Sequence, residues 1–97
     1  MSGIGAILDI CQTIESERTG ESVFHHLCGE IIELSHEVRG TGDGIDGVIG
    51  ESVDVILCAI DLIYQKNPTV TEDDINRVIQ RKLEKWQTLY GQQEKQQ

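Results

Sequence analysis

The sequence predicts an all-α protein, a four-helix bundle completed by dimerisation. Two observations carry this prediction: apolar residues recur every three or four positions in four segments, and no segment shows the strict alternation of a half-buried strand. At 97 residues with 38% hydrophobic content, the chain is long enough for one small core. We therefore expect a single domain over residues 1–97.

The first two helices are predicted over about residues 4–16 and 21–39, separated at Arg18-Thr19-Gly20. The second carries an apolar stripe from Phe24 to Val38. At about 100° per residue, Glu30, Glu33 and Glu37 gather beside one edge of that stripe. Glycines in the 40–47 segment break the helical pattern and supply the connection that follows.

The third helix, predicted over about residues 48–65, is apolar on nearly every side. Asp54 and Asp61 are its only charged residues between Ser52 and Tyr64. A helix of this kind is buried on all sides, and three other short helices can hardly cover it. We infer that a second copy of the chain does so.

The fourth helix is expected to begin after Asn67-Pro68, with Thr71 as its N-cap and acidic residues in its first turn. It is predicted to run to about Tyr90, and residues 91–97 are expected to be frayed. Its basic residues share one face at four-residue spacing, with one lysine nearby: Arg77, Arg81, Lys85 and Lys82.

Composition narrows the classes of partner. A net charge of −9 makes general binding to nucleic acid or to an anionic membrane surface unfavourable. The three cysteines lack Cys-x-x-Cys spacing, which argues against a disulfide framework or a zinc site. No stretch approaches the roughly 20 apolar residues of a membrane span. We expect a cytoplasmic protein that binds neither membrane nor nucleic acid.

Two short-spaced carboxylate pairs are the main chemical signal. Glu30 and Glu33 lie three apart in the second helix, and Glu51 and Asp54 lie three apart at the start of the third. Residues three apart share a helix face, so each pair can direct its oxygens toward one point. An all-carboxylate set suits Mg²⁺, with Mn²⁺ as a possible substitute, rather than zinc or copper.

These motifs resemble those of the MazG-like all-α nucleoside triphosphate pyrophosphohydrolases. The resemblance rests on Glu30-x-x-Glu33, then Glu51-x-x-Asp54, then the final helix with Lys82-Leu83-Glu84-Lys85. It covers about residues 24–91. Gly29 departs from the pattern, because an additional acid often stands there in related sequences.

The resemblance implies hydrolysis of a nucleoside triphosphate between its α- and β-phosphates, giving a monophosphate and pyrophosphate. It implies a homodimer or homotetramer with sites near subunit boundaries. It also implies that Glu30, Glu33, Glu51 and Asp54 hold Mg²⁺. One of these four, or an accessory carboxylate such as Glu37 or Asp61, would activate water. Lys82 and Lys85, with Arg81 or Arg77, would hold the departing pyrophosphate.

Two other functions remain open at this stage. Glu33-x-x-His36 resembles half of a ferritin-like di-metal site, which needs a second Glu-x-x-His. Alternatively, the chain is a non-enzymatic helical interaction module whose acidic faces only confer solubility. The nucleobase, the sugar, the number of metal ions, the general base and the biological role are not determined by the sequence.

Overall fold

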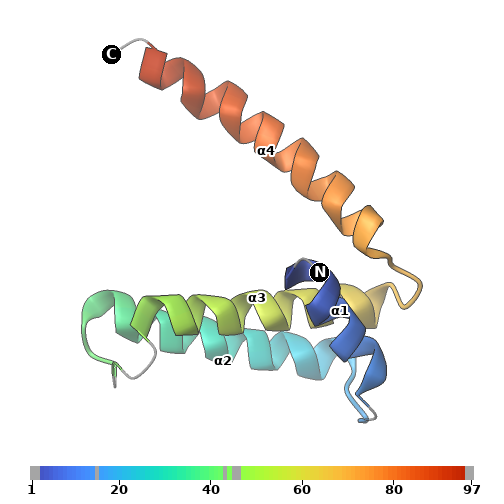
Figure 1. Cartoon of the computed structure of the whole chain (residues 1–97). Coiled ribbons are helices and arrows are strands. Elements are labelled where there is room, and N and C mark those ends of the chain that lie inside the picture. Colours follow the sequence, from blue (N-terminus) through green and yellow to red (C-terminus); the bar gives the residue numbers. More distant parts are fainter. Residues whose placement is uncertain (1–2, 15, 43, 45–46, 96–97) are drawn as a thin grey trace.

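Four helices make up the part of the chain that the structure describes. The computed structural model describes residues 3–14, 16–42, 44 and 47–95, with side chains as far as Gly91 (Figure 1). The helices are α1 (Gly3–Thr13), α2 (Gly20–Arg39), α3 (Gly47–Lys66) and α4 (Glu72–Lys95). The described residues contain no strand, so the all-α prediction is confirmed.

Helix α1 ends earlier than predicted, and α2 begins at a well-formed cap. The Arg18 guanidinium donates to the carbonyl oxygen of Cys11, near the C-terminus of α1, at 3.2 Å. Thr19 and Ser22 then form a capping box, in which each side chain accepts from the other residue's backbone N–H. Arg18 therefore contacts the end of α1, and Thr19 caps the start of α2.

Helices α2 and α3 form an antiparallel pair, and α1 packs across α3 (Figure 1). The chain reverses between α2 and α3 through the predicted glycine-rich segment. Gly40 adopts the left-handed conformation, φ +77°, that ends α2. The main buried cluster comprises Leu8, Ile60 and Ile75, with five partly buried residues against it: Ile4, Ile7, Ile63, Tyr64 and Val70.

Helix α4 joins this core only near its start and then extends away from the α2–α3 pair (Figure 1). The predicted cap is confirmed: the Thr71 hydroxyl accepts from the backbone N–H of Asp74, and the Asp74 carboxylate accepts from that of Thr71. The helix continues to Lys95, past the predicted end at Tyr90. The expected fraying of residues 91–97 stays a prediction, and residues 96–97 lie outside the described part.

One chain leaves much apolar surface uncovered. In α3 only Ile60 is buried, whereas Val53, Ile56 and Leu57 are each at least 40% exposed. Along α4, Trp86 is 63% exposed. The radius of gyration is 16.0 Å, against about 13 Å for a compact domain of 100 residues.

Candidate metal centre and adjoining cavity

Three of the four predicted carboxylates come together where α2 and α3 face each other. Glu30, Glu51 and Asp54 each offer one oxygen, and these oxygens lie within 4.8 Å of one another. All three residues are partly buried. Glu51 and Asp54 stand one turn apart on α3, and the antiparallel packing brings Glu30 of α2 to them.

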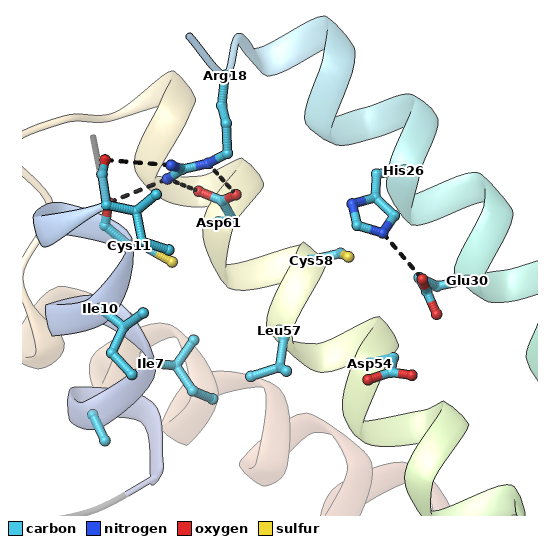
Figure 2. Close-up of a pocket in the computed structure, with 12 residues that line it drawn as sticks. Ile7, Ile10, Cys11, Arg18, His26, Glu30, Asp54, Leu57, Cys58 and Asp61 are labelled. Carbon is cyan, nitrogen blue, oxygen red and sulfur yellow. Dashed lines mark hydrogen bonds and ion pairs between the residues drawn. The ribbon is translucent and has the colours of Figure 1, made fainter. Parts of the chain in front are cut away.

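Glu33 does not belong to this group. It lies almost one turn beyond Glu30 on α2, and it is exposed. A contact that the sequence did not predict is present instead: the Glu30 carboxylate lies 3.1 Å from Nε2 of His26, one turn earlier on the same helix (Figure 2). His36, the other half of the Glu33-x-x-His36 motif, contacts the Thr41 hydroxyl through Nδ1.

Asp61 forms an ion pair rather than joining the three carboxylates. Both of its oxygens accept hydrogen bonds from Arg18, from Nε and from Nη2, each at 2.8 Å. Burial by itself would raise the pKa of Asp61, but the hydrogen bonds from Arg18, Gln65 and Cys11 and the positive charge of Arg18 together outweigh it and hold that pKa below its usual value. Since Arg18 also binds the carbonyl oxygen of Cys11, this pair fixes the end of α1 to α3.

The other accessory candidate, Glu37, serves the connection that follows α2. Its Oε1 accepts the backbone N–H of Gly44 at 2.8 Å. A Cβ atom added to Gly42 would lie 2.5 Å from the same carboxylate oxygen, so the backbone passes very close to it. Glu37 therefore stabilises the glycine-rich segment.

The predicted phosphate-binding residues are not next to the carboxylates within one chain. Arg81, Lys82 and Lys85 are all exposed on the part of α4 that extends away from α2 and α3 (Figure 1). Arg77, on the same helix, forms an ion pair with Asp74. Contact between these basic side chains and the carboxylates of Glu30, Glu51 and Asp54 would require α4 of another chain or a different position of α4.

A cavity of about 480 Å³ adjoins the carboxylates, within the size range of small-molecule sites. Glu30 and Asp54 line one end, and Arg18 and Asp61 line the other (Figure 2). Most of the remaining wall is apolar or sulfur-bearing: Ala6, Ile7, Ile10, Cys11, Ile14, Leu57 and Cys58, with His26 at the edge.

The pKa of Cys58, one of the two cysteines in this wall, depends on the charges around it. Partial burial raises the pKa of the Cys58 thiol, and the negative charges of Glu30, Asp54 and Asp61 raise it further. Carboxylates at both ends of the cavity therefore act electrostatically on this thiol. A divalent cation at Glu30, Glu51 and Asp54 would neutralise part of that charge.

Comparisons with profiles of known protein families, with curated protein sequences and with solved structures found no match. No helix among the described residues is long and apolar enough to cross a membrane. The function is therefore argued from the residues of the chain and their geometry.

Proposed function

We propose that this protein is a Mg²⁺-dependent nucleoside triphosphate pyrophosphohydrolase of the MazG-like type. It would act in the cytoplasm on a ribo- or deoxyribonucleoside triphosphate, giving the monophosphate and pyrophosphate. The observation that carries the proposal is the convergence of Glu30, Glu51 and Asp54 beside a cavity large enough for a nucleotide moiety. Carboxylates alone could be a solvated helix face; carboxylates at the end of an apolar cavity suit a ligand with both charged and apolar parts.

The donor set fits a hard cation. Glu30, Glu51 and Asp54 supply only oxygen ligands, as Mg²⁺ and Mn²⁺ prefer, and no described Cys or His belongs to the group. These three residues would hold the metal, and Glu33, which is exposed and outside the group, remains a proposed fourth ligand. Bound Mg²⁺ would offset the charge of the triphosphate and lower the pKa of a coordinated water.

The remaining chemistry belongs to the side chains of the protein. A carboxylate of the Glu30, Glu33, Glu51 and Asp54 set would accept the proton of the attacking water. His26 would fix the orientation of Glu30 through their contact of 3.1 Å. Lys82, Lys85 and Arg81 would hold the departing pyrophosphate by charge-assisted hydrogen bonds.

Those basic residues would come from a second copy of the chain. Beyond Ile75, which joins the buried cluster, the described part of α4 does not pack on the α2–α3 pair of its own chain, and its later apolar residues, such as Leu83 and Trp86, are exposed. The exposed residues Val53 and Ile56 of α3, which do not line the cavity, are a matching uncovered surface. A homodimer, alone or paired into a homotetramer, would bury both surfaces and bring α4 of one chain toward the carboxylates of the other.

The test is turnover of a panel of canonical and modified triphosphates by the purified protein, with Mg²⁺ and with EDTA. At least one nucleotide should yield its monophosphate and pyrophosphate, and EDTA should abolish the reaction. Asp54→Asn should lower kcat/KM by at least about a hundredfold, because it removes a proposed metal ligand. Asp73→Asn, a matched exchange at an exposed position on α4, should leave kcat/KM unchanged.

The competing account, a helical module without catalysis, expects no Mg²⁺ binding and an effect of Asp54→Asn on stability alone. Calorimetric titration with Mg²⁺ or Mn²⁺ separates the two accounts. Absence of binding together with absence of turnover would exclude the proposed function.

A further inference from the structure

The cavity continues past the carboxylates into a region that takes no part in the chemical step of the proposed hydrolysis. Its walls there come mainly from two helices: α1 supplies Ile7 and Ile10, and α3 supplies Leu57 (Figure 2). Ile14, which follows the end of α1, also lines the cavity. A triphosphate held at Glu30 and Asp54 would have its nucleoside in this part of the cavity, because it opens directly beside those carboxylates.

The length of the cavity suits a nucleoside. Asp54 and Asp61 mark its two ends on α3 and stand seven residues apart, which is about 10 Å along a helix axis. That length is comparable with the distance from the 5′ oxygen of a nucleoside to the far edge of its base. The base would then lie between Leu57 and the isoleucines of α1.

The polar groups at the far end are already engaged with one another. Arg18 donates to both oxygens of Asp61, to the carbonyl oxygen of Cys11 and to the hydroxyl of Ser16. Exchanging these bonds for bonds to a base would break the connection between α1 and α3. Direct reading of the hydrogen-bonding edge of a base by Arg18 or Asp61 is therefore unfavourable.

We propose that this cavity holds the nucleobase and selects it by shape and apolar surface rather than by its hydrogen-bonding pattern. The inference rests on the proposed function and names its substrate class: nucleotides whose base carries an apolar substituent, such as a 5-methylpyrimidine. Leu57 and Ile10 are the specificity-determining residues, and Arg18 and Asp61 are positioning residues that hold the α1 wall against α3.

The test compares two substrate pairs that differ by one methyl group, dTTP with dUTP and 5-methyl-dCTP with dCTP. The methylated member of each pair should have the higher kcat/KM, by about three- to tenfold, the worth of one methyl group against an apolar wall. Uracil and cytosine present different hydrogen-bonding edges, yet dUTP and dCTP should differ less than this.

Leu57→Ala should reduce the methyl preference in both pairs to less than about twofold, since it removes part of the wall. Ile56→Ala is the matched control, because Ile56 is the neighbouring residue, is similarly exposed and does not line the cavity. The ratio of two substrates measured on one protein sample does not depend on the fraction that is folded. Loss of folding therefore cannot imitate the result.

A measurement without metal or phosphate completes the test. Titration with thymidine should shift the methyl NMR resonances of Ile10 and Leu57 and leave those of Ile56 unchanged. Turnover without a methyl preference, or a preference that Leu57→Ala does not alter, would overturn the base-selection inference and leave the proposed hydrolysis standing. Absence of turnover with every triphosphate would refute the hydrolysis, and absence of methyl shifts as well would refute the nucleobase cavity.

Discussion

At the scale of single residues, the Arg18–Asp61 pair gives the protein a specific dependence on pH. The pKa of Asp61 is lowered in the folded protein, so its contribution to stability is fully present above the unfolded pKa, about 3.9, and is lost as the pH falls through the lower folded value. The side chains of the pair are only 21% and 17% exposed, so solvent screens their contact incompletely.

Asp61→Asn should therefore lower the free energy of unfolding by about 2 kcal/mol near neutral pH, the cost of losing charge-assisted hydrogen bonds. The difference between this variant and the wild type should shrink as the pH falls below about 4. Urea unfolding at several pH values measures both effects. A difference that is constant down to the lowest pH would show that Asp61 stabilises the fold by something other than its charge.

Cys58 offers a second residue-scale measurement, independent of turnover. Burial and the charges of Glu30, Asp54 and Asp61 raise the pKa of its thiol. Mg²⁺ bound at Glu30, Glu51 and Asp54 should lower the pKa of the Cys58 thiol, increase its thiolate fraction and accelerate its alkylation. Peptide mapping by mass spectrometry follows the alkylation rate of Cys58, and Cys28 of the same chain is the internal control. Equal acceleration of alkylation at both cysteines would point to a general salt effect.

Some residues of the candidate site are predictable from the sequence, and others are not. Asp54 was identified because a carboxylate in an apolar helix needs a partner or a ligand. Arg18 was missed, because it lies in a short linker and its partner is 43 positions away along the chain. The grouping of Glu30 with Glu51 and Asp54 but not Glu33 was also beyond the sequence, since it depends on how α2 is rotated against α3.

At the scale of elements, two glycines, one within α2 and one at its C-cap, should respond in opposite ways to the same substitution. Gly29 is within the helix, and an added Cβ atom would meet nothing within 4 Å. Gly40 has φ +77° at the end of the helix. Gly29→Ala should raise the free energy of unfolding by about 0.5–1 kcal/mol, and Gly40→Ala should lower it by about 1 kcal/mol.

Thermal and urea unfolding of the two alanine variants measure these changes. Destabilisation by Gly29→Ala would indicate that a surface outside the described chain packs closely against that position. Helix ends marked by glycine or threonine in the sequence, such as those at Gly40 and Thr71, were predicted within a few residues. The end of α1 was predicted too late; Arg18 binds the carbonyl oxygen of Cys11 there.

At the scale of the whole molecule, the number of helices and their type were predictable and their arrangement was not. Periodicity in the sequence identifies the buried faces but not what covers them. The sequence indicated that α3 needs cover on nearly every side, and the single chain leaves much of it exposed. The direction of α4, which decides where Arg81, Lys82 and Lys85 lie, is set by contacts that periodicity does not encode.

The proposed dimer makes a prediction at this scale. The purified protein should have at least twice the mass of one chain in light scattering. Trp86→Glu should weaken the assembly, because it places a charge among the exposed apolar residues of α4. Exchange of Glu84 for Gln, on the same helix, is the control. A wild-type protein that is monomeric at all concentrations would contradict the proposed origin of the basic residues.

The most direct test of the central claim is a ³¹P NMR spectrum of a single reaction with Mg²⁺ and a triphosphate that the protein consumes. We predict resonances of the monophosphate and of pyrophosphate in equal amounts, and no reaction with Asp54→Asn. Resonances of a nucleoside diphosphate and orthophosphate, or unchanged products and rate with Asp54→Asn, would contradict the account.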